Sequence, residues 1–131
     1  MQAIIFDLDN CLVPGDAIGR TAYDPAFEAI RQANDGRLSD AELAAAFADM
    51  WRHPLGDVAR SHRFTPGMLA AGWQVFAHMV ARAPMQAYPD IGVLAELPVP
   101  RFLVTTGFRQ LQESKIAALG LRDLFTEIRI D

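Results

Sequence analysis

Residues 3–12 read AIIFDLDNCL and decide the fold. An uncharged, mostly apolar run ends at Phe6 and is followed by two aspartates, Asp7 and Asp9, one residue apart. The run is rich in β-forming residues and too short for a helix, so we expect a buried parallel strand over 3–7. Side chains two positions apart in an extended chain point to the same side. Both carboxylates are therefore expected together at the exit of this strand.

The composition indicates one ordinary globular protein. The chain has 131 residues, of which 51% are hydrophobic, enough for a core without disulfide support. The single cysteine, Cys11, excludes an intramolecular disulfide. We expect it to be a small buried hydrophobe in a protein of a reducing compartment. No basic leader precedes an apolar stretch, and no window approaches the roughly 18 to 20 apolar residues of a membrane span. These features predict a cytoplasmic protein without a membrane partner.

Charge and histidine patterns argue against two further kinds of site. The formal net charge is −4, and the 12 basic residues are scattered, so no basic stripe is available for a nucleic-acid backbone. His53, His62 and His78 lack the spacing of metal ligands, and we expect them at the surface. The sequence therefore predicts neither nucleic acid nor a histidine-bound metal as a partner.

Residues 14–88 carry helical signals throughout, and we expect an all-helical insert. Three helices are predicted, over 24–36, 39–51 and 65–83, each with one apolar face. The expected inward side chains are, in chain order, Phe27, Ile30 and Ala33; Leu43, Phe47, Met50 and Trp51; and Leu69, Trp73, Phe76 and Val80. We expect the large residues to form the core of this insert.

Start signals support these three helices. Asp24 precedes Pro25 and is expected to cap the first helix. Ser39 and Glu42 have the spacing of a capping box at the start of the second helix. Thr65 is expected to cap the third.

The remainder of the chain alternates helix and strand. We expect a short helix over 89–97, a strand over 101–107, a helix over 108–120 and a strand over 125–130. This order suits a parallel sheet with right-handed crossovers. The predicted fold is α/β, with a discontinuous Rossmann-like core of residues 1–13 and 89–131 and a helical cap of residues 14–88.

Three polar residues lie at or just beyond the carboxyl ends of predicted strands. In open parallel sheets, ligands bind beyond the carboxyl ends of the strands, where Asp7, Asp9 and Thr105 are expected. Each alone has an ordinary explanation, because aspartate often hydrogen-bonds a turn and threonine suits a strand. Two carboxylates held close, however, repel unless a cation or a proton is present. The combination therefore favours a binding or catalytic site.

The motifs resemble those of one family. FDLDNCL (6–12) resembles the first motif of the haloacid dehalogenase superfamily, and FLVTTG (102–107) with the following helix is similar to its second motif. AYPDIGVLAEL (87–97) resembles the segment with which that family re-enters its core after a helical cap. The first motif is also similar to that of pyrimidine 5'-nucleotidase-like members, although six residues do not assign a substrate.

The resemblance implies phosphoryl transfer on two carboxylates. Asp7 would be the nucleophile that forms an aspartyl-phosphate, and Asp9 the general acid and base that protonates the leaving alcohol and then activates water. A halide leaves without a proton, so Asp9 argues against dehalogenation. Mg²⁺ would be bound by the Asp7 carboxylate and the Asp9 backbone carbonyl.

The resemblance also implies how phosphate is held. Thr105, with the backbone amides around Thr106 and Gly107, would bind the phosphoryl oxygens, and Asn10 would fix the first loop. The family further uses a Lys or Arg that neutralises phosphoryl charge. Here Lys115 and Arg109 are candidates, although a position on the helix surface is favoured for both.

The predicted function is therefore a Mg²⁺-dependent phosphomonoesterase acting on a small phosphorylated metabolite, such as a nucleotide or sugar phosphate. The alternative is a non-catalytic phosphate- or partner-binding module, or a truncated inactive fragment of such a hydrolase. The family's later acidic motif, a further source of metal ligands, is not found before Asp131. The run at 3–6 would then be an unpaired sheet edge. We therefore expect either a fragment or a chain that completes its sheet by homo-oligomerising.

Overall fold

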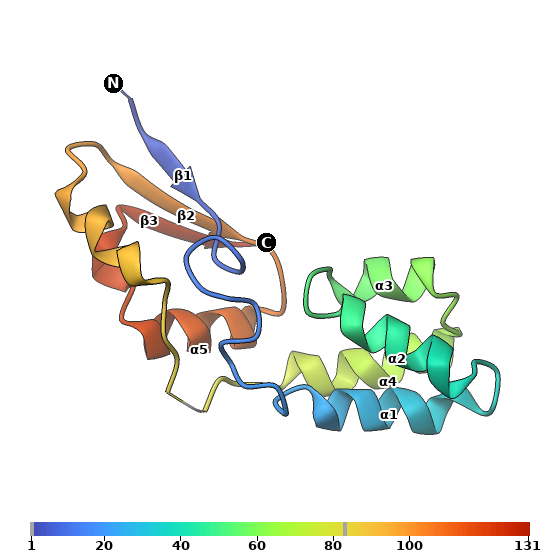
Figure 1. Cartoon of the computed structure of the whole chain (residues 1–131). Helices are drawn as coiled ribbons and strands as arrows, with labels where there is room; N and C mark the ends of the chain where they lie inside the picture. The colour runs from blue at the N-terminus through green and yellow to red at the C-terminus, as the bar shows by residue number, and fades with distance from the viewer. Residues whose placement is uncertain (1, 83) are drawn as a thin grey trace. The chain divides into compact units, whose positions relative to one another are not determined.

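The computed structural model describes residues 2–82 and 84–131 and divides into two units (Figure 1). One unit holds the residues up to Gly19 together with Val80–Asp131, and the other holds Arg20–Met79. The sequence placed these boundaries at 14 and 88. Met1 and Ala83, which the predictions included in the core and in the third helix, lie outside the described residues.

The first unit is α/β. Its elements are β1 (Ile4–Phe6), the 3₁₀ helix η1 (Pro89–Glu96), β2 (Arg101–Thr105), α5 (Arg109–Leu119), the 3₁₀ helix η2 (Arg122–Leu124) and β3 (Glu127–Ile130). The three strands are parallel in the order β1-β2-β3. Leu103 of β2 pairs with Phe6 on one side and with Ile128 on the other. The predicted α/β fold with a parallel sheet is confirmed.

The core of this unit lies between the sheet and α5. Leu8, Leu103 and Ile116 are completely buried in one apolar cluster, which supplies the main driving force for docking the helix on the sheet. Helix α5 ends at Gly120, whose φ of 65° is the left-handed conformation that glycine adopts at little cost. This stop agrees with the predicted helix end.

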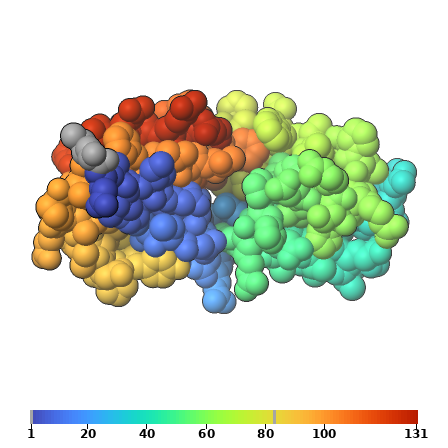
Figure 2. Space-filling view, turned by 90° about the horizontal axis from the view of Figure 1, so that it is seen from above, coloured from blue at the N-terminus to red at the C-terminus, as the bar shows by residue number. Residues whose placement is uncertain are grey.

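The prediction that the first strand is buried is wrong. β1 pairs only with β2 in the described sheet, and the Ile4 and Ile5 side chains are 37% and 70% exposed. In the space-filling view the blue residues near the N-terminus lie at the surface (Figure 2). The composition of this strand is typical of a buried strand. Burial also requires a paired strand on each side and packed elements on each face of the sheet. The expectation that this edge pairs with further strands stays a prediction.

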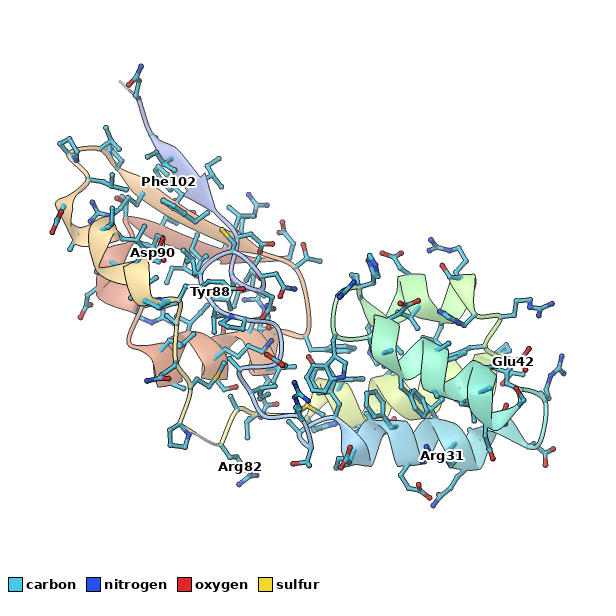
Figure 3. The ribbon with its side chains drawn as sticks, in the orientation of Figure 1. Arg31, Glu42, Arg82, Tyr88, Asp90 and Phe102 are labelled. Atoms are coloured by element: carbon cyan, nitrogen blue, oxygen red, sulfur yellow. The ribbon has the colours of Figure 1, made fainter. Side chains whose placement is uncertain are left out.

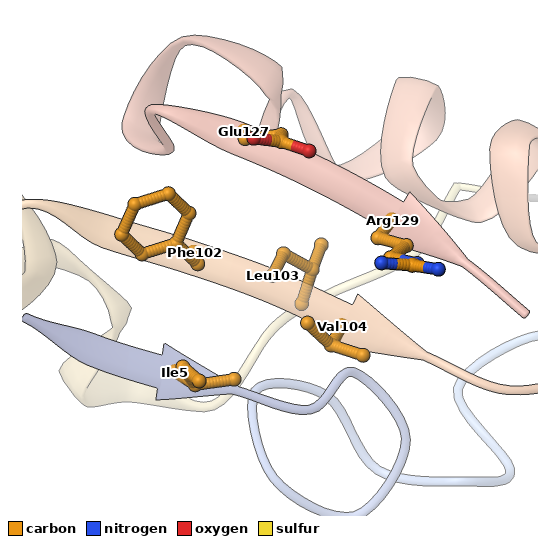
Figure 4. Close-up of a pocket in the computed structure, with 6 residues that line it drawn as sticks. All are labelled: Ile5, Phe102, Leu103, Val104, Glu127 and Arg129. Carbon is orange, nitrogen blue, oxygen red and sulfur yellow. The ribbon is translucent and has the colours of Figure 1, made fainter.

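A shallow groove runs over the sheet. Side chains alternate along β2, so Phe102 and Val104 face away from the side to which Leu103 points. Figure 4 shows the residues that line the groove, which are Ile5, Phe102, Leu103, Val104, Glu127 and Arg129. The groove is apolar along β1 and β2 and charged along β3.

The second unit is all-helical. Its elements are α1 (Asp24–Asn34), α2 (Asp40–Asp49), α3 (Leu55–Ser61) and α4 (Pro66–Ala77). α1 packs against α4, and Gly72 allows their close approach, because a Cβ there would lie 2.9 Å from Ile30 Cδ1. Aromatic rings fill the interior, with Tyr23 stacked on Trp51 at a centroid distance of 4.1 Å. Helix α3 is not among the helices predicted from the sequence.

Two of the three predicted helix starts are confirmed. Ser39 and Glu42 form a complete capping box on α2, and the Thr65 hydroxyl accepts the N–H of Met68 on α4. Glu42 lies on the outer surface of this unit (Figure 3). The hydrogen bond from the Ser39 backbone N–H, and then that with its side chain, lowers the pKa of Glu42 below its ordinary value. Asp24 is not the cap of α1, because it is already helical and Tyr23 takes the cap position.

The predicted length of the third helix is wrong, and its predicted inward face is confirmed only in part, since Phe76 is buried as expected. α4 ends at Ala77 and buries Met68, Gly72 and Phe76, whereas Trp73 is 54% exposed. The packing against Ile30 requires a small residue, so the helix turns Gly72 toward α1. Hydrophobic periodicity alone predicts that the large side chain of Trp73 points inward. Close packing of two helices instead favours the small residue, Gly72, at their contact.

Candidate functional site

The carboxyl ends of β1 and β2 lie side by side because the two strands are parallel and directly paired. Asp7 follows β1 immediately, and Thr105 is the last residue of β2. Asp9 lies two residues beyond Asp7 in the loop that leaves β1. The sheet therefore brings the two predicted motifs to one edge, as the sequence implied.

The loop after β1 is held by its own backbone. The Leu8 carbonyl accepts hydrogen bonds from the N–H groups of Cys11, Leu12 and Val13 at 3.3, 2.9 and 3.2 Å. Asn10 adopts φ 59°, and its Oδ1 accepts the N–H of Gly15 at 2.9 Å. Asparagine tolerates this left-handed conformation better than most residues. The tight loop sets the direction of the Asp9 side chain.

Asp9 lies in a network with α5. Lys115 Nζ lies 3.0 Å from Asp9 Oδ1 and 3.2 Å from Oδ2, and Gln112 Nε2 donates to Asp9 Oδ2 at 3.0 Å. The Lys115 side chain is 3% exposed and that of Asp9 is 31% exposed. Gln112 and Lys115 are three residues apart, so both lie on the same face of the helix. Both oxygens of Asp9 are therefore held by donors.

The same glutamine joins Asp9 to the second motif. Gln112 Nε2 also lies 2.8 Å from Thr105 Oγ1, and both residues are 2% exposed. One buried amide thus links the loop after β1 with the end of β2.

The remaining predicted phosphate-binding groups lie at the loop after β2. Thr106 and Gly107 are exposed. The Gly107 N–H donates to the Asp131 carbonyl at 3.1 Å, so in this structure that amide is engaged within the protein. Asp7 is exposed, and its Oδ1 accepts the N–H of Leu8 at 2.7 Å. Its position at the strand end leaves the carboxylate accessible to a ligand.

The structure separates the two candidate cations. Lys115 contacts Asp9 directly, whereas Arg109 Nη2 donates to the Ile130 carbonyl at 2.8 Å and Nη1 lies 3.6 Å from Glu113 Oε1. The Arg109 side chain is 68% exposed. The site residue that the sequence analysis missed is Gln112. Its signal was available, because Gln112 and Lys115 are polar residues three apart that adjoin the apolar Leu111 and Ile116 in the predicted helix.

The donor set suits Mg²⁺ in part. Carboxylate and carbonyl oxygens are the ligands that Mg²⁺ prefers, and it usually keeps several waters beside one or two carboxylates. The exposed carboxylate of Asp7, two residues before Asp9 in the chain, fits that pattern. No group of three or more His, Cys, Asp or Glu side chains that could hold a metal occurs within residues 2–82 and 84–131.

Other predicted side chains lie elsewhere. Cys11 is exposed, so the expectation of a small buried hydrophobe is wrong. It lies in the surface loop that the Leu8 carbonyl organises, and no core element covers it. His62 Nε2 lies 2.7 Å from Asp49 Oδ2 and is half-buried rather than at the surface. Within the described part of the chain, no helix has the length and apolarity needed to cross a membrane.

Known structures share this fold. A haloacid dehalogenase-like family hydrolase from Xanthomonas campestris aligns with a TM-score of 0.53 and 22% identity, over 100% of this chain and 62% of that one. The HAD-hydrolase YfnB from Bacillus subtilis, solved bound to magnesium, aligns with a TM-score of 0.53 and 14% identity over 98% of this chain and 63% of that one. L-2-haloacid dehalogenase from Xanthobacter autotrophicus aligns less well, with a TM-score of 0.43 and 21% identity over 98% of this chain and 56% of that one.

This chain therefore has the fold of haloacid dehalogenase-like hydrolases and spans less than two thirds of the length of these structures. No protein-family model matches the sequence, and no curated protein matches it.

Proposed function

We propose that the chain carries the nucleophile and the acid–base residue of a Mg²⁺-dependent phosphomonoester hydrolase of the haloacid dehalogenase superfamily. The observation that supports this most is the fixed carboxylate of Asp9, held by Lys115 and Gln112 two residues after an accessible Asp7. A fixed second carboxylate serves a reaction in which a proton must be delivered and removed. Loss of a halide requires no such group, so the arrangement favours phosphate esters over haloacids.

The reaction divides into two steps. In the first, an Asp7 carboxylate oxygen attacks phosphorus, the bond from phosphorus to the ester oxygen breaks, and Asp9 donates a proton to the departing alcohol. In the second, Asp9 takes a proton from water, which attacks the aspartyl-phosphate and releases inorganic phosphate. The two donors on Asp9 match its carboxylate form, which is the base of the second step.

Other groups manage charge. Thr105 would donate its hydroxyl hydrogen to a phosphoryl oxygen. Lys115 acts through Asp9, because its ammonium group contacts that carboxylate. When Mg²⁺ is bound by the Asp7 carboxylate and the Asp9 backbone carbonyl, it supplies neutralisation of the phosphate charge. The substrate we propose is a small phosphorylated metabolite, with nucleoside monophosphates and sugar phosphates as the classes to test.

The test is hydrolysis of p-nitrophenyl phosphate with and without Mg²⁺, followed by a panel of nucleoside monophosphates and sugar phosphates. We expect Mg²⁺-dependent release of phosphate, which Asp7→Asn abolishes without unfolding the chain, because asparagine keeps the volume but is not a nucleophile. Asp35→Asn is the matched control, since Asp35 is exposed and has the left-handed φ of 50° that asparagine also tolerates.

Two results would count against the proposal. Wild-type turnover by Asp7→Asn would exclude the covalent mechanism. Phosphate binding without any hydrolysis would instead support the non-catalytic module.

A further inference from the structure

Gln112 is a buried polar side chain whose contact with Thr105, unlike its contact with Asp9, has no part in the proposed reaction. It is 2% exposed, and its Nε2 atom lies 3.0 Å from Asp9 Oδ2 and 2.8 Å from Thr105 Oγ1. Asp9 follows β1, and Thr105 ends β2. A single amide therefore bridges the two chain segments that carry the proposed chemistry.

Asp9 determines which way the Gln112 amide points. A carboxylate accepts hydrogen bonds and cannot donate them, whereas the glutamine NH₂ group offers two hydrogens. With the oxygen turned toward Asp9, two acceptors would face each other in a buried place, which is costly. The NH₂ group therefore faces Asp9, and its second hydrogen is directed to Thr105.

This orientation restricts the hydroxyl of Thr105. A threonine hydroxyl has one hydrogen to donate and two lone pairs to accept with. Toward Gln112 Nε2 it must accept, because that nitrogen carries hydrogens and no available lone pair. The hydroxyl hydrogen of Thr105 is thus left for another acceptor, and a phosphoryl oxygen is the acceptor that the proposed reaction brings.

Gly107 leaves the space in which Gln112 lies. A Cβ at position 107 would lie 3.3 Å from both Cγ and Cδ of Gln112, and the φ of +149° is one that other residues rarely adopt. The glycine that ends the second motif therefore accommodates this side chain. The fit ties Gln112 to the phosphate-binding loop by packing as well as by hydrogen bonds.

We propose that Gln112 is a positioning residue of this site. Through one amide hydrogen it holds the carboxylate of Asp9, and through the other it makes the Thr105 hydroxyl a donor to a phosphoryl oxygen. This inference rests on the proposed function, since it assigns the orienting of both groups to a residue that does not touch substrate.

A merely structural role makes a different prediction. An apolar side chain of similar size would fill the same space, and exchanging a hydrogen-bonded buried amide for such a group often changes stability little. If Gln112 only fills space, its replacement by methionine leaves turnover per folded molecule unchanged. If it positions Asp9 and Thr105, turnover falls while the fold persists.

The experiment compares Gln112→Met with Gln110→Met, a matched control on the exposed part of α5. We expect Gln112→Met to lower kcat for p-nitrophenyl phosphate on the order of 10²-fold, as small misplacements of reacting groups do, with a much smaller change in KM. Gln110→Met keeps wild-type values.

A double variant tests the link to Thr105. In a Thr105→Val background, Gln112→Met lowers kcat by a smaller factor, because one of the two side chains that Gln112 holds is already absent. Gln112→Leu, which also removes the amide donors without adding charge beside Asp9, replaces Gln112→Met if the latter does not fold.

Each outcome decides the inference. Wild-type kcat in folded Gln112→Met, or equal losses with and without Thr105, overturns it. If the wild-type chain does not hydrolyse phosphate esters, the proposed function fails, and titration with inorganic phosphate and Mg²⁺ followed by NMR decides instead. Weaker phosphate binding by Gln112→Met than by wild type then supports the orienting role, and equal binding or no binding overturns it.

Discussion

The two units of this protein bury polar side chains for different reasons. The helical unit buries Asn34, whose amide donates to the Leu38 carbonyl and accepts the Leu38 N–H, both at 2.9 Å. The α/β unit buries Thr105, Gln112 and Lys115, and all three belong to the network of Asp9.

Sequence separation is the main difference between the two sets. The partners of Asn34 are four residues away, whereas Asp9 is 103 and 106 residues from Gln112 and Lys115. A local pair satisfies the backbone at a helix end, where carbonyl and N–H groups would otherwise lack partners. A long-range network gathers groups that only the folded sheet brings together. If the proposed function holds, polar burial serves stability in one unit and chemistry in the other.

Among the substitutions that test this difference between the two units, Asp9→Asn is expected to have the largest effect. Asparagine keeps the volume but cannot deliver a proton, so turnover of alkyl phosphates should fall on the order of 10²- to 10⁴-fold. The loss for p-nitrophenyl phosphate should be smaller, because its leaving group needs little protonation. Steady-state kinetics on both substrate types measures this. Equal losses would reject Asp9 as the general acid.

Lys115→Met tests whether the network serves chemistry more than stability. Methionine retains the apolar stem of lysine but removes the cation from Asp9. Since Asp9 is 31% exposed, water can solvate its carboxylate, and the stability loss should stay below the roughly 3–5 kcal/mol typical of breaking a fully buried pair. Turnover should nevertheless fall on the order of tenfold or more.

Denaturant unfolding and kinetics on the same samples measure the two effects of Lys115→Met. Arg109→Met is the comparison variant, because Arg109 is exposed and bonded to a backbone carbonyl. A greater loss of turnover in Arg109→Met than in Lys115→Met would reverse the assignment of the cation.

Asn34→Ala should affect the stability of the helical unit and leave turnover per folded molecule unchanged. It removes two hydrogen bonds, and the N–H and carbonyl of Leu38 must then bind water instead. The free energy of unfolding should fall by about 1–3 kcal/mol. Tryptophan fluorescence during urea unfolding measures it selectively, because Trp51 and Trp73, the two tryptophans of the chain, both lie in this unit. Gln32→Ala, at an exposed position of the same helix, serves as control. A similar loss in both variants would show that Asn34 contributes no more than helix propensity.

The smallest effect is expected from the capping box. The hydrogen bonds from Ser39 lower the pKa of Glu42 in the folded protein below its ordinary 4.5. A lowered folded pKa means that the carboxylate stabilises the fold above its unfolded pKa, and that this contribution is lost as the pH falls through the folded pKa. The unfolding midpoint, followed by tryptophan fluorescence, should therefore drop between about pH 5 and about pH 3 by more in the wild type than in Glu42→Gln. The same pH dependence in both proteins would contradict this assignment.

Local signals account for what could be read from the sequence. The capping box of Ser39 and Glu42 and the stop at Gly120 involve neighbours within a few residues, so their patterns are visible in the chain itself. The spacing of Asp7 and Asp9 after an apolar run likewise placed both at the exit of a strand, because the period of an extended chain is two. The strand and helix alternation after residue 89 predicted the parallel sheet.

Tertiary packing decided the rest. The strand at 3–7 has the composition of a buried strand, yet Ile5 is 70% exposed because only β2 pairs with it in the described sheet. Hydrophobic periodicity predicts that Trp73 points inward, but the close approach of α1 and α4 requires Gly72 at their contact. The exposure of Ile5 and of Trp73 depends on which elements pack against each other. That packing is determined by residues in distant segments of the chain.

The side chains that contact Asp9 show most clearly what the sequence determines and what the tertiary structure determines. The sequence by itself determined that a carboxylate follows the first strand, and it left Lys115 and Arg109 as equal candidates for the cation. Only the docking of α5 against the sheet, driven by burial of Leu103 and Ile116, turns Gln112 and Lys115 toward that carboxylate. Helix rotation about its axis is set by the apolar core, and it therefore selects which polar side chains reach the site.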